Sequence, residues 1–363
     1  MKILYILNSI TDFKSGCHFF RIFLPSLFMT RKGVEINYVT HNYDKEKIGG
    51  MIKWADVVSF QRAYSDNNDI KNIIKLCKEY KKKIAYDLDD DIWNIVDENP
   101  AICSAKNLDK SAKILLKNAD IVTTTTQILK NALLKLNKNV EIVENAIDPM
   151  VYKDYGKTDE SLPIVVYAGS ASHWKDFMTI LPTLAKIKEE IPFVFVMIGF
   201  TQSPLDSAMY EYKKLQSFGA KDKNSKYQKV ALECYEYLKK MNVVHFPFYT
   251  PELFPTILAK QINGDIGICP LEDVVFNHSK SCLKFYEYGA CGMATIAPRI
   301  LPYSEEVDYT YVDLNDFENK FKKLLKDKEL RREVAQRQMK WVLENRDINK
   351  IVDKWIKIYG QKN

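Results

Sequence analysis

Short runs of β-branched and aromatic residues alternate with helical stretches along nearly the whole chain, and this alternation restricts the fold more than any other feature. In the first part of the chain, strands are expected at residues 2–7, 34–40, 55–60, 82–88, 119–126 and 140–145. Helices are expected between them near 18–31, 67–80, 104–118 and 126–136. Short buried strands separated by helices are typical of parallel sheets built from βα units. A doubly wound α/β domain is therefore predicted.

The alternation stops at the polar segment 148–162 and then begins again. The second series has expected strands at 163–169, 193–199, 242–246, 265–270 and 293–298, and expected helices at 176–190, 225–240, 252–262 and 281–290. Residues 200–241 are less regular, which indicates an inserted loop before the helix near 225–240, and the tail 314–360 is helical and charged. We predict two Rossmann-like domains facing a cleft. The expected divisions are an N-terminal domain at 1–148, a C-terminal domain at 149–345, and a last helix at 346–363 that returns to the first domain.

The composition is that of a globular protein and does not identify a substrate. The 363 residues are 46% hydrophobic and 28% charged, as in a globular chain, and the formal net charge is +6. This charge is compatible with anionic lipid or phosphate-bearing substrates, but it does not establish nucleic-acid binding. The seven cysteines form no C-x-x-C pair, so free thiols in a reducing cytosol are expected and zinc is not. The sequence has no run of about 18 apolar residues, so no membrane span is predicted. The N-terminal apolar run is too short for a signal peptide.

The stretch "NHSKSCLKFYEYGACG", residues 277–292, concentrates charge at the edge of the predicted cleft. The spacing places Lys280, Lys284 and Glu287 on one face of a helix, and Ser279 or Ser281 is expected to cap it. Two interpretations are open. The face is either an ordinary solvated one, or it is an anion site formed by lysines beside the free N–H groups of a helix N-terminus.

Three further loops follow expected strands. In "AGSASHWKDF", Gly169 and Ser170 begin a small-residue loop that leads to Lys175, a pattern that lets a backbone approach phosphate. His173 in the same loop is either a ligand contact or a structural residue. The loop after the first strand contains Gly16 and leads into a helix with Arg21, without the G-x-G-x-x-G spacing of dinucleotide-binding proteins.

The third loop, in "YDLDDDIW", holds a cluster of carboxylates at the end of the fourth expected strand. Asp87, Asp89, Asp90 and Asp91 could bind a metal, act as a base or hold an acceptor hydroxyl, or they could serve only as turn and N-cap residues. A metal site is the weaker interpretation, because no further carboxylate or histidine partner is evident.

Taken together, these stretches resemble retaining nucleotide-sugar glycosyltransferases of the GT-B fold. The "E-A-M-A-C-G-x-P-V-I-A" motif of that group stands here as "E-Y-G-A-C-G-M-A-T-I-A" from Glu287, and "VENAID" at 143–148 is similar to its "P-N-G-I-D" signature. The set "FQR", "YDLDDDIW", "GSASHWKDF" and "NHSKSCLKFYEY" resembles a subgroup found in surface-polysaccharide and phage gene sets. The resemblance covers nearly the whole chain.

The resemblance implies roles for individual residues. Glu287 would bind the donor ribose, and Lys175 would hold the diphosphate. Gly16 would allow a close approach of the N-terminal loop. The residues it assigns to catalysis are Lys175, Lys280, Glu287 and Asp90. Those it assigns to the donor are Gly16, Arg21, Gly169, Ser170, His173, Asn277, Ser279, Ser281, Cys282, Leu283 and Lys284. Asp89 and Asp91 are assigned to the acceptor.

The chain also departs from the family pattern. Many relatives carry a second glutamate eight residues before the one that matches Glu287, and here that position is Ser279, with Asn277 or Lys280 as substitutes for its sugar contact. Ser170 stands where an arginine is usual, and "NGID" is "NAID". The histidine common near the reaction centre has no evident match in the N-terminal domain.

The resemblance implies transfer of a sugar from a UDP- or GDP-sugar to an acceptor hydroxyl with retention, without a metal or other cofactor. The donor phosphate would receive the acceptor proton, and an aspartate in 89–91 would position the acceptor, which is a glycan, lipid-linked, protein or nucleic-acid hydroxyl. A cytoplasmic protein is expected, with peripheral association at the inner membrane face as an option. The alternatives are a DNA-base glycosyltransferase or a sugar-nucleotide epimerase on the same fold, or a non-catalytic partner subunit. The oligomeric state is not indicated.

Overall fold

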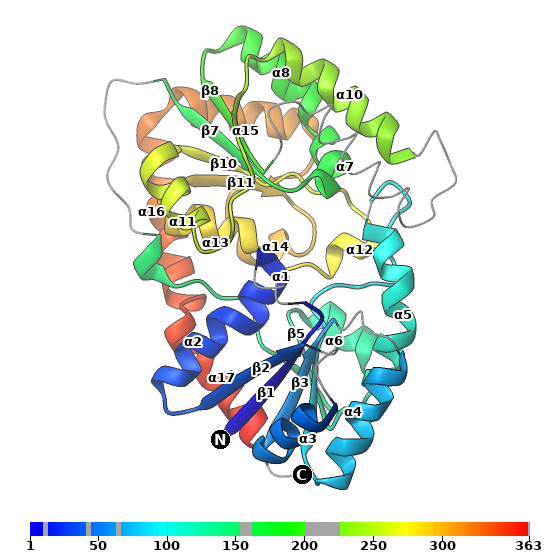
Figure 1. The fold of residues 1–363 in the computed structure, drawn as a ribbon. Coiled ribbons are helices and arrows are strands. Elements are labelled where there is room, and N and C mark those ends of the chain that lie inside the picture. The colour runs from blue at the N-terminus through cyan, green and yellow to red at the C-terminus, as the bar shows by residue number, and fades with distance from the viewer. Residues whose placement is uncertain are drawn as a thin grey trace.

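The chain folds into two α/β halves, one above the other, in the computed structural model shown in Figure 1. The structure describes residues 1–9, 14–40, 45–62, 67–99, 101–152, 162–199 and 226–361. Within these ranges each half is built around one six-stranded parallel sheet. The expected insertion at 200–225, and residues 153–161 of the expected linker, lie outside the described residues.

The first sheet has the strand order β2-β1-β3-β4-β5-β6. Its strands are β1 (Lys2–Leu7), β2 (Glu35–Thr40), β3 (Val57–Gln61), β4 (Lys83–Asp87), β5 (Ile121–Thr124) and β6 (Val140–Ile142). The two central strands β3 and β4 are buried almost throughout, as expected for a parallel sheet covered by helices on both faces. Chain order reverses beside β1, and in doubly wound sheets a ligand crevice opens at such a switch point.

Helices cover both faces of this sheet. They are α1 (Gly16–His18), α2 (Leu24–Arg31), α3 (Lys45–Trp54), α4 (Asn67–Glu79), α5 (Ala101–Asn118) and α6 (Gln127–Leu133). The helix expected at 18–31 is interrupted, because a π-helical turn at Phe19–Phe23 joins α1 to α2. Pro25, at the start of α2, has no N–H to donate to a carbonyl one turn earlier, which accounts for irregular geometry just before it.

The second sheet has the strand order β12-β11-β10-β7-β8-β9. Its strands are β7 (Ile164–Ala168), β8 (Val194–Ile198), β9 (Val244–Phe246), β10 (Ile266–Ile268), β11 (Ala294–Pro298) and β12 (Thr310–Tyr311). Its helices are α7 (Trp174–Met178), α8 (Leu181–Glu190), α10 (Lys226–Lys240), α11 (Phe254–Thr256), α12 (Val275–His278), α13 (Leu283–Ala290), α14 (Tyr303–Glu306), α15 (Leu314–Lys326) and α16 (Lys328–Asn345). A π-helical turn at Ile257–Ile262 continues α11. The expected helix 176–190 is divided between α7 and α8, and the short elements α12, α14 and β12 were not expected.

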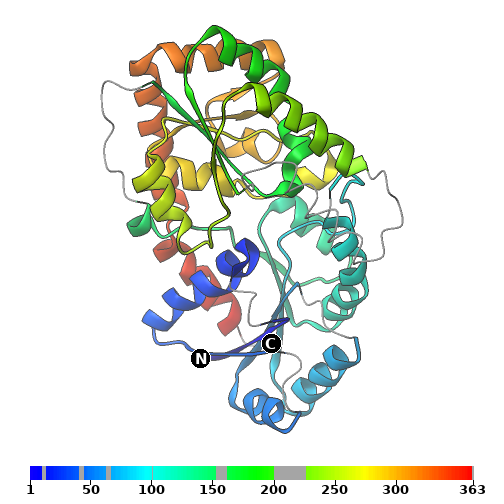
Figure 2. The ribbon, with the colours of Figure 1, turned by 45° about the horizontal axis from the view of Figure 1, so that its top comes forward.

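The last helix, α17 (Ile348–Gly360), leaves the second half and packs against α2 of the first. The red helix lies beside the blue one in both Figure 1 and Figure 2. The crossing is held by the backbone, because Ile147 N donates to the Arg346 carbonyl and Ile348 N donates to the Ile147 carbonyl, each at 2.9 Å. Trp355 of α17 is buried in a hydrophobic cluster that contains side chains of both halves, among them Phe20 and Phe285. The two sheets therefore share part of one core.

Within the described residues, no helix combines the length and the apolar character that crossing a membrane requires.

Candidate active site

A cavity of about 450 Å³ lies where the carboxyl ends of the two sheets meet. Its wall in the first half is formed by Gly16, Cys17, Phe20, Arg62, Asp89, Asp90, Asn99, Ala101 and Asn145. Its wall in the second half includes Gly169, Ser170, Ser172, His173, Gly199, Phe248, Tyr249, Phe254, Lys280, Ser281, Leu283, Lys284, Glu287 and Tyr303. Several of these residues, among them Arg62, Gly169 and Gly199, directly follow a strand, which is the position at which open α/β sheets bind ligands. The cavity is therefore the candidate active site.

Lys284 brings a positive charge to the wall of the second half. Its ammonium group has no hydrogen bond or ion pair with any described residue, although it lies near Glu287 and Asp176. Burial lowers the pKa of Lys284, and the nearby Lys280 adds to that shift. A Cβ at Gly169 would make an ordinary contact with Lys284 Cε at 3.6 Å and a tight one with the Tyr167 hydroxyl at 3.1 Å, so the glycine chiefly makes room for Tyr167. Among the described residues, no anionic side chain forms an ion pair with Lys284, so the cavity contains an unpaired cation.

Lys280 stands on the same wall, four residues earlier in the chain. It precedes α13, which begins at Leu283, so the expectation that it shares a helical face with Lys284 and Glu287 is wrong. Its ammonium lies 4.3 Å from the centre of the Phe276 ring, and no described carboxylate pairs with it. Contact with an aromatic face stabilises a cation without neutralising it. The two lysines therefore make this wall basic, as an anion site requires.

Glu287 is the carboxylate of the same wall, and it is 9% exposed. Its Oε1 accepts a 2.9 Å hydrogen bond from the Tyr152 hydroxyl. Burial raises the pKa of Glu287 to about 7, while the Tyr152 hydrogen bond and the Lys284 charge act in the opposite direction. A carboxyl group with this pKa changes its protonation state near neutral pH, which is common among residues at functional sites.

His173 is held by a buried carboxylate. Its Nδ1 lies 2.8 Å from Asp176 Oδ2, and Asp176 Oδ1 accepts hydrogen bonds from Glu272 N at 2.9 Å and Asn277 Nδ2 at 2.8 Å. Burial lowers the pKa of His173 to about 4, and the two lysines contribute to the shift. Burial raises the pKa of Asp176, but the His173 and backbone hydrogen bonds outweigh it and leave the pKa below its ordinary value. His173 is thus neutral at pH 7, with Nδ1–H donated to Asp176 and Nε2 left as an acceptor.

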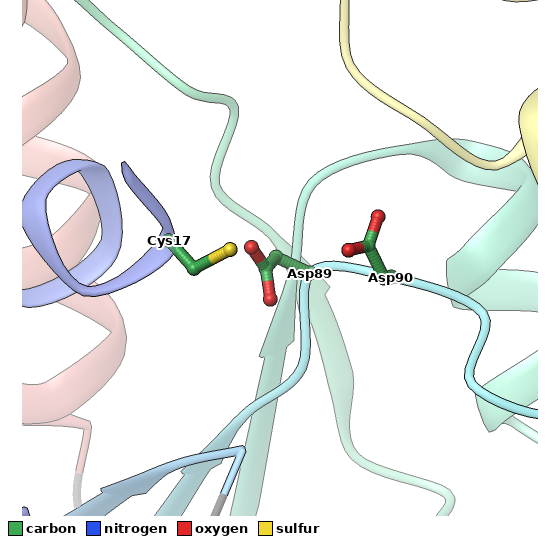
Figure 3. Close-up of side chains that lie close together, drawn as sticks. All are labelled: Cys17, Asp89 and Asp90. Carbon is green, nitrogen blue, oxygen red and sulfur yellow. The ribbon is translucent and has the colours of Figure 1, made fainter. Parts of the chain in front are cut away.

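The opposite wall carries Asp89 and Asp90, with Cys17 pointing toward Asp89 from α1 (Figure 3). Arg62 pairs with both carboxylates, through Nε to Asp89 Oδ1 at 2.6 Å and through a terminal nitrogen to Asp90. Burial raises the pKa of Asp89, but Arg62 more than compensates, so that the pKa lies below its ordinary value. Potential ligand atoms of Cys17, Asp89 and Asp90 lie within 4.8 Å of one another. Because a guanidinium already neutralises part of this group, it is a poor site for a cation.

Arg62 was not expected at the site. It directly follows β3 and has a positive φ of 52°, and its N–H donates to the Asp87 carbonyl of β4 at 3.2 Å. The feature of the sequence that could have identified Arg62 as a site residue is its position just beyond a parallel strand, because the carboxyl ends of these strands meet at the cleft. Tyr152 and Asp176 were also missed. Tyr152 has no distinguishing pattern around it. Asp176 stands in the stretch "AGSASHWKDF", but only its hydrogen-bond partners indicate its role.

Arg21 does not face the cavity, contrary to the expectation for the donor site. It is 1% exposed and lies beneath the cavity wall. Its guanidinium pairs with Asp87 at 2.7 Å, donates to the Val143 carbonyl at 2.6 Å and to Asn145 Oδ1 at 3.1 Å, and packs over the Trp355 ring. A buried guanidinium must have its donors satisfied. Arg21 therefore joins β4, the segment after β6 and α17.

Lys175 also lies outside the cavity wall. Its ammonium pairs with Glu98 at 3.4 Å and with Glu272 at 3.1 Å, so it connects the first half to the loop after β10. Asp91 is a turn residue, since it accepts from Trp93 N and from Asn94 Nδ2. Neither side chain is placed to contact a ligand in the cavity.

The expected serine cap is wrong. The helix begins at Leu283, with Cys282 as its N-terminal neighbour and no side-chain cap. Ser279 Oγ instead donates to the Phe276 carbonyl at 2.8 Å, and Ser281 Oγ accepts from Asn145 Nδ2 at 2.8 Å. Asn277, Ser279 and Cys282 are buried behind the wall rather than in it. The predicted residues that do line the cavity are Gly16, Asp89, Asp90, Gly169, Ser170, His173, Lys280, Ser281, Leu283, Lys284 and Glu287.

Comparison with solved structures identifies the fold, whereas comparison by sequence identifies no family. No protein-family model matches the chain, and no curated protein sequence matches it. Among solved structures, HepE from Anabaena in complex with UDP-glucose is similar with a TM-score of 0.62 and 13% identity, covering 98% of this chain and 99% of that one. A trehalose-6-phosphate synthase, from work on glycosyl transfer with retention, is similar with a TM-score of 0.60 and 11% identity, and the match covers 100% of both chains.

The lipopolysaccharide outer core galactosyltransferase WaaB, in its apo form, is similar with a TM-score of 0.55 and 11% identity, covering 99% of each chain. These matches extend over both sheets and the helix that crosses between them, and so they concern the whole architecture rather than one domain. The chain has the GT-B fold, with two Rossmann-like α/β domains facing a cleft.

Proposed function

We propose that this protein transfers a sugar from a nucleoside-diphosphate sugar to an acceptor hydroxyl, with retention of configuration at the anomeric carbon. The observation that carries the proposal is Lys284, a half-buried lysine on the cavity wall whose ammonium has no anionic partner among the described residues. A charge removed from water is costly unless it is paired. A diphosphate in the cavity would supply that pairing. The similarity to glycosyltransferases of known structure supports this choice of ligand.

The donor would lie against the wall of the second half. Lys280 and Lys284 would contact the diphosphate, and the first N–H groups of α13, which begins at Leu283, would add donors. Glu287 lies one turn further along the same helix, where its carboxylate would accept hydrogen bonds from the ribose hydroxyls. The neutral His173, with its Nε2 as an acceptor, would contact a hydroxyl of the sugar.

In the reaction, the bond between the anomeric carbon and the diphosphate oxygen breaks, and the diphosphate leaves with the electron pair. The two lysines stabilise the charge that grows on that oxygen, which is the main electrostatic contribution such a site can make. The acceptor hydroxyl attacks from the same face and gives its proton to the departing phosphate. Asp89 and Asp90 would position the acceptor. No metal is required, because lysine side chains and N–H groups neutralise the leaving group.

We place this activity in the cytoplasm, with peripheral association at a membrane surface as an option for lipid-linked acceptors. The six cysteines for which the structure gives a state are free thiols, as is usual in a reducing compartment.

The proposal is tested by calorimetry with UDP, GDP and a panel of their sugars on the full chain. Lys284→Met should weaken nucleoside diphosphate binding by roughly 10- to 100-fold, the usual cost of a lost charged hydrogen bond. Lys340→Met is the matched control, since the Lys340 side chain is 76% exposed and remote from the basic wall. A chelator should leave the affinity unchanged. Absence of binding to every nucleotide tested, or equal effects of the two variants, would sink the proposal.

A further inference from the structure

The two walls of the cavity carry opposite charge. The wall of the second half has the ammonium groups of Lys280 and Lys284. The wall of the first half has Asp89, Asp90 and Arg62, where two carboxylates against one guanidinium leave one net negative charge. A group bound between these walls therefore meets a positive potential on one side and a negative potential on the other.

The negative wall keeps its charge at neutral pH. The ion pair with Arg62 holds the pKa of Asp89 below its ordinary value in spite of burial. The Cys17 thiol lies in this wall, and its pKa depends on the charges around it. Burial raises the pKa of its thiol, Arg62 acts in the opposite direction, and Asp89 and Asp90 both act to raise it further. The thiol is therefore uncharged, and the wall retains its net negative charge.

The carboxylates of this wall accept hydrogen bonds, and a further acceptor lies behind them. Gln61, which is 1% exposed, donates its amide N–H to Asp89 Oδ1 at 3.0 Å, and its Oε1 has no partner among the described residues. Gln61 does not line the cavity, so the acceptors that a bound group would meet on this wall are the oxygens of Asp89 and Asp90. Hydroxyl and ammonium groups supply donors to these oxygens, whereas phosphate and carboxylate groups do not.

We infer that the part of the acceptor entering this cavity is a hydroxyl compound without negative charge, a neutral sugar or an amino sugar, and that phosphorylated or carboxylated sugars are rejected there. The inference rests on the proposed function, because it assigns the wall of the first half to the acceptor. Its physical basis is repulsion by the net charge of the Asp89–Asp90–Arg62 group, together with the carboxylate oxygens that accept hydrogen bonds on this wall.

The charge of the wall can be measured without knowing the acceptor. Cys17 lines the cavity and is half-buried, while the other five cysteines given a state are buried. The full chain is treated with methanethiosulfonate reagents carrying an ethylammonium or an ethylsulfonate group, and the rate found in Cys17→Ser protein is subtracted. Relative to a free thiol, the cationic reagent should be favoured by about tenfold, as expected for one net charge a few ångströms away in a partly screened site.

Two variants should shift the ratio of cationic to anionic reaction rates in opposite directions. A general loss of folding would not produce opposite shifts. Asp90→Asn should bring the ratio of cationic to anionic rates toward that of the free thiol, and Arg62→Gln should raise the ratio. Asp90 is suited to this test because its side chain is 25% exposed. Equal rates for the two reagents in the unmodified chain, or a preference for the anionic one, would overturn the inference.

A second arm uses transfer itself, with any nucleotide sugar that binds in calorimetry. Methyl glucoside, glucosamine, glucose 6-phosphate and glucuronate are offered at equal concentration, and products are separated by chromatography. The neutral and amino sugars should be used at least about tenfold better than the two anions, and Asp90→Asn should narrow this difference. Preferred use of an anionic sugar refutes the inference while leaving the glycosyl-transfer proposal intact. Loss of all nucleotide binding refutes that proposal, and the thiol rates still report the charge of the wall.

Discussion

The Tyr152 hydroxyl donates a 2.9 Å hydrogen bond to Glu287 Oε1, and so the chain segment between the two sheets contacts the carboxylate of the basic wall. Tyr152 is 2% exposed and directly follows the short helical turn Pro149–Val151. The bond stabilises the charged form of a carboxyl group that burial would otherwise protonate. The protonation state of Glu287 is therefore set in part by a residue of the segment that joins the two sheets.

Nucleoside diphosphate affinity should depend on pH through Glu287. Its pKa is about 7, so the carboxylate that accepts ribose hydroxyls is lost as the pH falls below this value, and the affinity decreases. Tyr152→Phe removes a hydrogen bond that lowers the pKa, and the midpoint should therefore move above 7. Glu287→Gln should abolish the dependence. Calorimetric titrations between pH 5.5 and 8.5 measure the midpoint (range chosen to span about one and a half units on each side). A midpoint that does not move in Tyr152→Phe contradicts the coupling.

Glu287 should also reduce the stability of the free protein at high pH. The pKa in the folded state is about 7 against an ordinary 4.5, so the stabilising contribution is present below pH 4.5 and is lost as the pH rises through 7. At 1.36 kcal/mol per unit, the loss is on the order of 3 kcal/mol. Glu287→Gln should raise the free energy of unfolding at pH 8 and leave it nearly unchanged at pH 4, as measured by urea denaturation. A gain of equal size at both pH values would contradict the prediction.

Asp176 should matter for transfer because it orients His173. Asp176→Asn removes the carboxylate that holds His173 Nδ1–H, and the transfer rate should fall by roughly 10- to 100-fold. Asp273→Asn is the matched control, since Asp273 pairs with His278 in an exposed position outside the cavity wall. Both variants need thermal melting curves, because Asp176 also accepts from Glu272 N and Asn277. If the transfer rate of Asp176→Asn falls while its melting temperature is unchanged, the orientation of His173 is the cause. An unchanged transfer rate rejects this role for Asp176.

Arg21 should contribute to stability and not to ligand contact. Arg21→Met leaves Asp87 buried without its cation, which should cost about 3–5 kcal/mol of unfolding free energy. Lys32→Met is the comparison, because Lys32 and Asp353 form an exposed pair whose loss should cost less than about 1 kcal/mol. Adding Asp87→Asn to Arg21→Met should recover part of the loss. Equal costs for the two single variants in urea denaturation would contradict the buried role.

The secondary structure could largely be predicted because its cause is local. The strands at the centre of each sheet, such as β4 and β7, are buried on both faces and therefore consist of continuous apolar runs. The observed ends of β4 and β7 lie one residue inside the expected ranges. The short β12, at Thr310–Tyr311, has no such run and pairs only at the edge of its sheet, so nothing in its residues distinguishes it from a loop.

The candidate site could be predicted in part, and Lys284 and Lys175 show where the limit lies. The spacing of Lys284 and Glu287 puts them one turn apart on one helix, whereas Lys280 lies before the start of α13 and reaches the same wall from the preceding loop. Lys175 follows a glycine-containing loop after a strand and looked equally suitable. Its ammonium is taken by Glu98 and Glu272, which are distant in the sequence and reach it only when the two halves come together.

The sequence by itself determined the alternation of strands and helices, the two-domain architecture, and the helix that carries Lys284 and Glu287, because these depend on periodicity within a few residues. Only the tertiary structure decided which charges are satisfied and which remain available. Arg21 and Lys175 are paired by carboxylates from other segments, Arg62 joins Asp89 and Asp90, and Lys284 finds no partner among the described residues. The physical reason is that the cost of a buried charge depends on its neighbours in space, and these come from distant parts of the chain.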